Sequence, residues 1–403
     1  MKDDRRNPML SQEIEEKLAE RLAQRINEIN TYILREIGSN IKRLSMLNTR
    51  EINQLAQMLK YGGSYERIVQ ELAKVTGKNV SEIYEMFEEI AKSNKDFAKQ
   101  FYKYRHMDFI PYSKDIGLQE QVKSLAKITV ETYLNFSKTR VIGYVFEELD
   151  GTRTFKNIQQ TYQETIDRAI LSISQGKESF YSNMRYTLKE LGRSGLVEYK
   201  SGRTRRLDSA VRMNVLDGIR RLNRETSLRF GQEYDADGVE ISVHSNPAPD
   251  HADIQGRQFS LEEFDKLEEG NVAIDYKGNK YNGADKRHIG EYNCYHKLFN
   301  IVLGVSKPLY TDKQLNEIKE ENEKGFEYEG KHYTNYEGTQ LQRKIELEIR
   351  KQKDTMLLAK SSGDKELQAE SEIIIDQLID KYDSLCKISG LRPQKQRMGS
   401  VKL

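Results

Sequence analysis

Cysteine is scarce in this sequence, and so are the long apolar segments of membrane and exported proteins. Only Cys294 and Cys386 are present, far apart, which excludes a disulfide framework. No run approaches the roughly 18 apolar residues of a membrane-spanning helix, and the opening MKDDRRNPMLSQEIEE has no apolar signal-peptide core. We therefore expect a soluble protein that is made in a reducing, intracellular compartment and is not exported by a signal peptide.

A large excess of charge of one sign is also lacking. The 403 residues include 65 Lys and Arg against 63 Asp and Glu, a net charge of +2. This balance excludes wholesale coating of nucleic acid, so any contact with DNA would have to be local. Charged residues make up 32% of the chain and hydrophobic residues 37%. Such a composition favours long amphipathic helices and assembly surfaces over one compact globule.

The signatures of several common enzyme classes are missing. The sequence has no G-x-S-x-G, no Walker phosphate loop, no H-E-x-x-H and no H-x-E paired with C-x-x-C. These motifs position the reacting groups of serine hydrolases, P-loop nucleotide hydrolases, zinc proteases and zinc deaminases. No familiar catalytic geometry is therefore encoded in the order of the residues.

Periodic apolar residues predict a largely helical N-terminal half. From 11 to 37 they recur every three or four positions, the stripe of an amphipathic helix that includes Ile14. Asn48-x-x-Glu51 predicts the start of a second helix over about 48–59, which Gly62-Gly63 would end. In the segment 141–155 apolar and polar residues alternate, and Asp150-Gly151 is a turn sequence, so a short hairpin is predicted there. Further helices are predicted over 65–75, 81–104, 118–135, 155–175 and 178–192, and around the stripe Val211, Val215, Ile219 and Leu222.

The C-terminal half shows mixed patterns. Val239, Ile241 and Val243 alternate with polar residues and predict a strand that places His244 on its polar face. Two capping sequences, Ser260-x-x-Glu263 and Thr311-x-x-Gln314, each predict the start of a helix. The segments 276–281 and 328–333 read as hairpins, with glycine in a turn between aromatic strand residues. Helical periodicity is predicted again from Gly338. A break at 361–363 divides this segment into two helices, and the second ends near Leu385.

Together these elements predict an α+β fold that is predominantly α-helical. A helical N-terminal half would be followed by a smaller mixed domain with short hairpins, and then by long C-terminal helices. The basic tail is expected to be mobile unless a partner orders it. The predicted regions are 1–110 (helical), 111–236 (helical, with a basic segment), 237–337 (α+β, with histidine and cysteine), 338–390 (C-terminal helices) and 391–403 (basic tail).

Histidine and cysteine gather in the α+β region. His244 and His251 flank a Pro-Ala-Pro loop, and Cys294 and His296 follow as a C-x-H pair. Four nitrogen and sulfur donors match the number that zinc takes, so zinc is the cofactor this set could hold. The spacing differs from common zinc modules, and C-x-H in a strand would point its two side chains apart. The alternative is a hydrogen-bonded histidine network around an inert buried thiol.

The same region also permits an enzymatic hypothesis. Asp250-His251, Asp285 and His288 could form a hydrolytic or metal-dependent nuclease site in which a carboxylate orients a general base. Cys294 beside His296 or His288 could instead supply a thiol nucleophile. Both hypotheses require side chains that the sequence alone does not bring together.

Arginine is concentrated just before this region. Arginines of the segment 199–206 and of the next helix could contact DNA phosphates or the acidic surface of a partner protein. The alternative is a solvated helix face with its own acidic partners, as the spacing of Arg221 and Glu225 allows. The candidate contact residues are Arg203, Arg205, Arg206, Arg220, Arg221 and Arg224.

Four motifs carry a resemblance to a known family. They are SGRTRRLDSAVRMNV at 201–215, H-x6-H-x3-QG beginning at His244, NC-x-H beginning at Asn293, and LGVSKP at 303–308. With them the chain resembles the minor capsid, or head morphogenesis, proteins of tailed bacteriophages, the Mu F-like and minor capsid protein 2 group. The resemblance covers most of the chain. In it, the motif residues that shape the C-terminal domain are Asn246, Asp250, Gln255, Gly256, Asn293 and Gly304.

The resemblance implies a function that composition and spacing do not reach. It implies a structural, non-enzymatic protein of the phage head, made in the bacterial cytoplasm and carried in the virion. The implied partners are the portal protein and capsid or scaffold proteins, with phage DNA as a further candidate during packaging or ejection and no membrane during assembly. A metal-dependent hydrolase and a DNA-binding protein are the alternatives from other classes.

Overall fold

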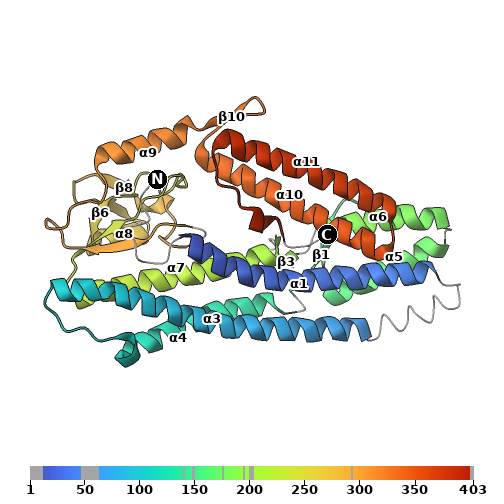
Figure 1. The fold of residues 1–403 in the computed structure, drawn as a ribbon, viewed down its shortest axis with the longest axis horizontal. Coiled ribbons are helices and arrows are strands. Elements are labelled where there is room, and N and C mark those ends of the chain that lie inside the picture. Colours follow the sequence, from blue (N-terminus) through green and yellow to red (C-terminus); the bar gives the residue numbers. More distant parts are fainter. Residues whose placement is uncertain are drawn as a thin grey trace. The chain divides into compact units, whose positions relative to one another are not determined.

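The computed structural model describes residues 12–46, 63–138, 141–147, 150–174, 177–193, 196–198, 204–291 and 294–399. Within them the fold is α+β and predominantly helical, which confirms the predicted class. The predicted helix over 48–59 lies outside the described residues. The helices are α1 Gln12–Ser45, α3 Gly63–Tyr104, α4 Ile116–Phe136, α5 Ile158–Ser174, α6 Lys177–Arg193, α7 Leu207–Glu233, α8 Leu261–Glu268, α9 Asp312–Lys324, α10 Asn335–Ser362 and α11 Lys365–Ser389 (Figure 1).

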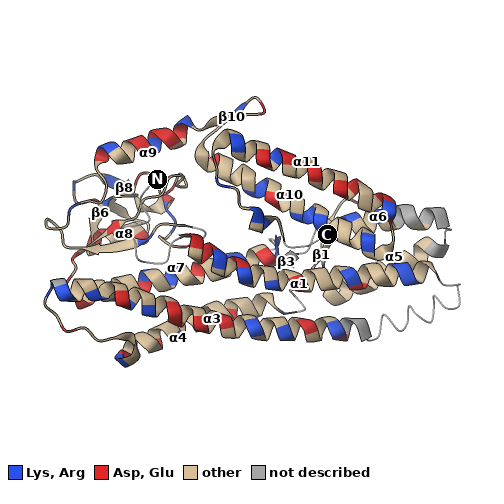
Figure 2. Cartoon of the chain, viewed as in Figure 1, with Lys and Arg blue, Asp and Glu red and all other residues tan. Residues whose placement is uncertain are grey.

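The chain divides into two compact units, and each is discontinuous in sequence. Unit 1 comprises Met1–Ala19, Ser81–Glu131 and Met213–Gln340. Unit 2 comprises Glu20–Val80, Thr132–Arg212 and Leu341–Leu403. Basic and acidic residues are interspersed along helices such as α1, α3 and α11, as the near-neutral composition requires (Figure 2).

The apolar stripe of α1 is buried except at its beginning. In unit 2, Leu22, Ile26 and Ile33 are at most 1% exposed, as the three-to-four spacing predicts. In unit 1, Ile14 is 43% exposed and the neighbouring Glu15 is 1% exposed. The Glu15 carboxylate accepts a hydrogen bond from Asn223 Nδ2 at 3.1 Å. A buried polar interaction therefore replaces the apolar stripe in the first turns.

One continuous helix, α3, replaces the two helices predicted over 65–75 and 81–104. Gly77 lies inside it, where a Cβ would meet nothing within 4 Å. Two residues later, in unit 2, Asn79 is fully buried and donates to the Tyr133 hydroxyl at 3.0 Å. A helix interior tolerates glycine at a cost of about 1 kcal/mol. The polar run around Gly77 is thus part of the helix and not a break.

Unit 2 contains a four-stranded antiparallel sheet in the order β2-β1-β3-β4. The predicted hairpin is present as β1 (Ile142–Glu147) and β2 (Arg153–Asn157), with Val145 opposite Phe155. A Cβ at Gly143 would lie 2.0 Å from the carbonyl oxygen of Lys156, so only glycine fits there. The other two strands are β3 Leu196–Glu198 and β4 Thr204–Arg206.

Long C-terminal helices complete unit 2, and the tail packs onto it. The division predicted at 361–363 separates α10 from α11. Beyond α11, a 3-10 turn over Lys395–Met398 buries Met398 to 6% exposure, and Lys353 Nζ donates to the Gly399 carbonyl. Up to Gly399 the tail is therefore packed, and the expectation of a mobile end is wrong for this part.

Unit 1 contains a three-stranded antiparallel sheet in the order β6-β5-β9. The strands are β5 Gly238–Ile241, β6 Gln258–Ser260 and β9 Leu298–Ile301. All four residues of β5 are buried, including Glu240, which the alternation assigns to a polar face. Its carboxylate accepts from Gln258 Nε2 at 2.7 Å and from the Leu309 N–H at 3.0 Å. Satisfied hydrogen bonds thus permit burial on both faces of the strand.

Both predicted hairpins of unit 1 are present. The first joins β7 (Val272–Ile274) to β8 (Lys280–Asn282), but Tyr276 lies in the turn, 55% exposed, instead of in a strand. The Asp275 carboxylate sets this turn, because it accepts from the N–H groups of Lys277 and Asn279. The second hairpin joins β10 Phe326–Tyr328 to β11 Lys331–Tyr333.

The predicted helix caps differ in how completely they form. The hydroxyl of Thr311 and the side chain of Gln314 form both halves of a capping box at α9. At α8, the Ser260 hydroxyl accepts from the Glu263 N–H, but the Glu263 carboxylate accepts from the N–H of Ile274 instead of returning to the cap. That carboxylate therefore ties α8 to the adjacent β7.

Candidate functional site

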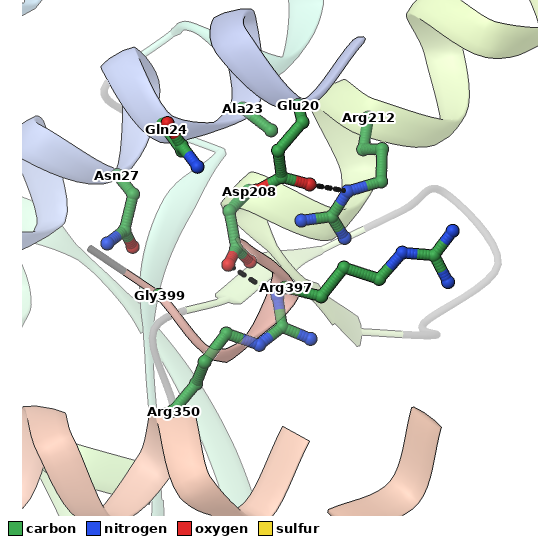
Figure 3. Close-up of a pocket in the computed structure, with 9 residues that line it drawn as sticks. All are labelled: Glu20, Ala23, Gln24, Asn27, Asp208, Arg212, Arg350, Arg397 and Gly399. Atoms are coloured by element: carbon green, nitrogen blue, oxygen red, sulfur yellow. Dashed lines mark hydrogen bonds and ion pairs between the residues drawn. The ribbon is translucent and has the colours of Figure 1, made fainter. Parts of the chain in front are cut away.

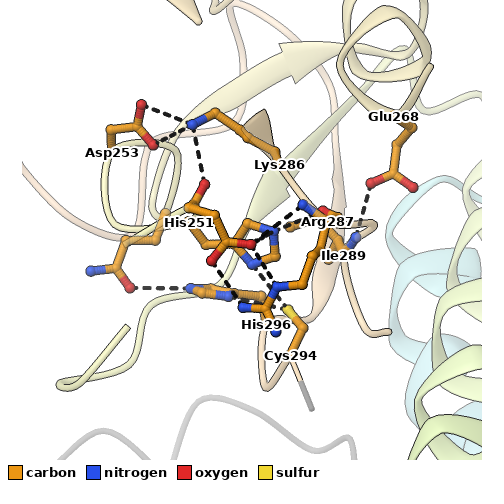
Figure 4. Close-up of polar contacts among 10 residues, drawn as sticks. His251, Asp253, Glu268, Lys286, Arg287, Ile289, Cys294 and His296 are labelled. Atoms are coloured by element: carbon orange, nitrogen blue, oxygen red, sulfur yellow. Dashed lines mark hydrogen bonds and ion pairs between the residues drawn. The ribbon is translucent and has the colours of Figure 1, made fainter. Parts of the chain in front are cut away.

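Strand pairing in unit 1 brings the histidine and cysteine residues together. β5 and β9 pair antiparallel with Ile241 opposite Leu298, and the Ser242 N–H then donates to the Lys297 carbonyl at 2.8 Å. His244 and His296 therefore lie beyond the paired ends of two adjacent strands. His251 comes from the connection between β5 and β6, and its ring centroid lies 5.2 Å from that of His296 (Figure 4).

Three of the four predicted donors form a close cluster. Cys294 Sγ lies 3.3 Å from His251 Nδ1 and 3.4 Å from His296 Nδ1. The three donor atoms all lie within 4.8 Å of one another, and the side chains are buried. His244 lies outside this set, although its ring centroid is 4.3 Å from that of His296. Because β9 begins only at Leu298, the strand geometry that would separate Cys294 from His296 does not apply.

The second nitrogen of each clustered imidazole is held by an oxygen atom. His251 Nε2 lies 2.8 Å from the carbonyl oxygen of Arg287. His296 Nε2 lies 3.3 Å from Gln255 Oε1, which also accepts from the backbone N–H of His244 at 3.2 Å. Both rings are thus fixed through Nε2, with Nδ1 directed at the sulfur.

The loop that carries His251 is held in a defined shape. Asp250 makes a bidentate ion pair with Arg287, at 2.6 and 2.9 Å. The Gly256 N–H donates to the Ile241 carbonyl at 2.8 Å, and Gly256 has a φ of 70°, a conformation that favours glycine. Arg287 is a residue that sequence reasoning missed. The run of charged residues just before His288 is the signal that could have drawn attention to it.

Burial determines the protonation of the cluster. It lowers the pKa of His244 to about 4, lowers the pKa of His251, and lowers that of His296 well below the usual range. The imidazoles are therefore neutral at neutral pH, the form in which histidine binds metal ions. Burial raises the pKa of the Cys294 thiol, although the backbone N–H groups of Gly290 and His296 act in the opposite direction.

Comparison with known protein families supplies the deciding observation. The model of the family described as phage minor capsid protein 2 matches residues 15–384. The chain belongs to this family. Neither the curated proteins nor the solved structures include a match to it. In the described part of this phage minor capsid protein, no helix combines the length and apolar character needed to cross a membrane.

The arginines predicted to contact DNA or a partner are largely engaged within the protein. Arg203 lies outside the described residues, and Arg205 is exposed on β4. In unit 2, Arg206 is 5% exposed and donates to Asp354 at 2.7 Å. Its guanidinium is therefore committed to an internal ion pair.

The arginines of α7 in unit 1 follow the same pattern. Arg220 is 3% exposed, and its guanidinium lies 4.2 Å from the ring centroid of Tyr295. Arg224 pairs with Glu268 at 2.9 Å. Arg221 is the most accessible of the three and lies 3.9 Å from Glu291, so the pair suggested by its spacing to Glu225 is not the one formed. This geometry favours a structural role for α7 in the minor capsid protein.

Among the acid and base groups of the enzymatic hypothesis, Asp250 and His251 lie close together, with 3.7 Å between Asp250 Oδ2 and His251 Nε2, but each lies closer to a group of Arg287. The Asp250 carboxylate is held by Arg287, and Asp285 accepts from Asn282 Nδ2 at 2.7 Å. His288 Nδ1 lies 2.8 Å from a carboxylate oxygen of Glu268. Cys294 and His251 do lie close enough for a thiol–imidazole pair, but both are at least 97% buried, so a substrate has no direct access to the sulfur.

A buried charge network in unit 2 was not predicted. Arg350 donates to Asp208 and Arg212 donates to Glu20 beside a cavity of about 10 Å³ (Figure 3). Arg206, which donates to Asp354, belongs to the same network through its contact with Asp208. That volume accommodates about one water molecule. Arg350 lies 142 positions from Asp208 in the chain, so no local pattern could have paired them.

Proposed function

We propose that this phage minor capsid protein is a low-copy structural component of the phage head, acting in head morphogenesis at the portal and the inner capsid. The observation that carries the proposal is the family match over residues 15–384, which leaves little of the chain for a separate enzymatic domain. On this proposal its partners are the portal protein and capsid or scaffold proteins. It is made in the host cytoplasm and retained in the virion.

Features of both units support a structural role over a catalytic one. The cavity beside Asp208 and Arg350 in unit 2 and the cavity beside Arg220 and His296 in unit 1 each have a volume of about 10 Å³. Ligand sites for small molecules usually occupy several hundred Å³. The charged residues around them are joined in internal ion pairs, an arrangement that fixes packing.

We place contact with DNA behind contact with proteins. Arg206 and Arg224 form ion pairs inside their units and Arg220 is buried against the ring of Tyr295, so a part in DNA packaging or ejection would have to use other residues. Binding of duplex DNA by this chain should weaken steeply with salt if phosphate contacts carry it. Binding that is absent, or unaffected by salt, would remove DNA from the proposed partners.

The number of copies per particle tests the proposal directly. Purified phage particles are analysed by quantitative mass spectrometry with labelled peptides, using the major capsid protein as the internal reference. We expect a reproducible small number of copies per head, far below the count of the major capsid protein. Absence from mature particles, together with presence in proheads, would limit the protein to an assembly factor. Absence from both would contradict a structural role in the head.

A further inference from the structure

The clustered side chains of unit 1 contain more hydrogen-bond acceptors than donors. A carbonyl oxygen only accepts, so His251 Nε2, 2.8 Å from the Arg287 carbonyl, carries the hydrogen. The backbone N–H of His244 identifies the Gln255 atom it contacts as oxygen, so His296 Nε2 carries a hydrogen as well. In a neutral imidazole the other nitrogen is then a bare acceptor. Both Nδ1 atoms therefore present lone pairs to the sulfur.

The thiol of Cys294 satisfies only one of these two acceptors. It has a single hydrogen, and it lies 3.3 Å from His251 Nδ1 and 3.4 Å from His296 Nδ1. Among the contacts of the described residues, neither Nδ1 has another hydrogen-bond partner. The three side chains are 1%, 3% and 3% exposed, so bulk water does not serve the remaining lone pair. Burial of an unmatched acceptor is destabilising.

The distances within the cluster fit a single bound ion. Zinc lies about 2.0–2.1 Å from imidazole nitrogen and about 2.3 Å from thiolate sulfur, which at tetrahedral angles separates nitrogen from sulfur by roughly 3.5 Å. The observed separations of 3.3 and 3.4 Å are close to this value. An ion at this position would engage both Nδ1 lone pairs and replace the thiol hydrogen.

The surroundings match those of histidine ligands in metal proteins. Such ligands usually donate their second N–H to a carbonyl or carboxylate oxygen, which orients the ring. Here the Arg287 carbonyl and Gln255 Oε1 occupy these positions. Arg287 and Arg220 are positive charges nearby, but Arg287 is neutralised by Asp250 at 2.6 Å, and Arg220 lies 3.8 Å from Glu15. A thiolate would contribute the remaining negative charge.

We propose that His251 Nδ1, Cys294 Sγ and His296 Nδ1 bind one divalent transition-metal ion, with zinc as the expected occupant. Two imidazoles and a thiolate suit zinc, whereas calcium and magnesium prefer oxygen donors. On binding, the thiol proton is released to solvent and the sulfur takes the negative charge. The ion would fasten the loop between β5 and β6 to the segment that leads into β9. The proposed ion is therefore structural, and the proposal does not depend on the location of the protein in the phage head.

Metal analysis of the full-length protein tests this proposal. The protein is purified without added metal, incubated with a modest excess of Zn²⁺, and passed through a desalting column before elemental analysis. We expect about one zinc per chain, as for a single site of this ligand set. After exchange into Co²⁺, we expect a near-ultraviolet thiolate-to-cobalt charge-transfer band, which reports a sulfur ligand directly.

Matched variants separate this site from adventitious binding. Cys294→Ser and His251→Ala should each lose the zinc and the cobalt band. Cys386→Ser changes the other buried cysteine, and His332→Ala changes an exposed histidine, so both should retain metal at the wild-type level. Circular dichroism of each variant shows whether it has folded. If His251→Ala does not fold, Cys294→Ser, which changes a single atom, provides the test. Wild-type protein without zinc, or a folded Cys294→Ser with an unchanged cobalt band, would overturn the proposal.

Discussion

Lys95 shows how individual charges are accommodated in unit 1. Its side chain is 1% exposed, and its Nζ lies 3.0 Å from Asp115 and 3.3 Å from Glu233. Arg229 contacts the same two carboxylates, each at 3.0 Å. A buried cation without its partners is strongly destabilising, so loss of either carboxylate should destabilise unit 1 even where the ion pairs add little net stability over an apolar core.

The Asp115 carboxylate should make unit 1 sensitive to acid. Burial alone would raise its pKa, but the Leu118 N–H and Lys95 outweigh burial and lower it. A carboxylate with a lowered folded pKa stabilises above its unfolded pKa of about 3.9, and this contribution is lost as pH falls through the folded pKa. Asp115→Asn should therefore reduce the free energy of unfolding at pH 7, by up to about 3–5 kcal/mol because Lys95 loses a partner.

Urea denaturation of wild type and Asp115→Asn across a pH series measures this effect. The difference in the free energy of unfolding between the two proteins should shrink as the pH falls below about 4. Glu120→Gln changes an exposed carboxylate in α4, the helix that begins directly after Asp115; it is the control and should differ little from wild type at any pH. A difference that stays constant down to the acid limit would show that Asp115 acts through packing and not through its charge.

The residues of the candidate site were only partly predictable. His251, Cys294 and His296 could be named from residue type alone, because few side chains bind soft metal ions. The oxygen atoms that fix their tautomers could not, since Arg287 is 36 positions from His251 and Gln255 is 41 from His296. Such contacts depend on strand pairing. The same limit explains why the arginines of α7 were taken for surface residues although Arg220 is buried.

Two helix glycines of unit 2 should respond oppositely to the same substitution. A Cβ at Gly77 in α3 would meet nothing within 4 Å, whereas one at Gly192 in α6 would lie 2.1 Å from Thr355 Oγ1. Gly77→Ala should raise the free energy of unfolding by about 0.5–1 kcal/mol, because alanine loses less backbone entropy on folding. Gly192→Ala should lower it by about 1–3 kcal/mol through overpacking.

Chemical denaturation of both alanine variants against wild type gives this comparison. The paired design controls for the general helix preference of alanine, which is common to both positions. A stabilised Gly192→Ala would mean that α6 can move away from Thr355 at little cost. A destabilised Gly77→Ala would indicate that the flexibility of α3 at this point is needed in the folded state.

At the scale of elements, the strongest periodic signals gave correct predictions, whereas the predicted breaks did so only in part: the one at 361–363 is present, and the one before residue 81 is not. The hairpin β1–β2, the helix α7 and the capping box of α9 all follow from short-range chemistry. The break expected before residue 81 is absent, because Asn79 is satisfied by tertiary hydrogen bonds instead of local ones. Glu240 is buried for the same reason. Polar residues indicate a break in a helix or strand only when no residue distant in sequence satisfies their hydrogen bonds.

For the molecule as a whole, removal of the proposed zinc should have a local effect. Hydrogen exchange followed by mass spectrometry compares zinc-loaded protein with protein treated with a chelator. Faster exchange is expected around His251 and from Cys294 to Leu298, where the ion would join two segments of unit 1. Amides of unit 2, such as those of α10 and α11, should exchange at the same rate in both samples. The Cys294→Ser variant should exchange like the chelated protein with or without zinc. A uniform change in exchange rate across both units would contradict a local structural role for the ion.

The interleaving of the two units has a consequence for synthesis on the ribosome. Unit 1 needs residues as late as Gln340, and unit 2 needs residues up to the C-terminal segment, although both also use the first hundred residues. Neither unit can be completed while the early helices emerge from the ribosome. The apolar faces of these helices therefore stay uncovered until later segments of the same unit have been translated. We therefore expect the nascent chain to expose apolar surface until late in its synthesis, the condition in which incomplete chains are prone to aggregate.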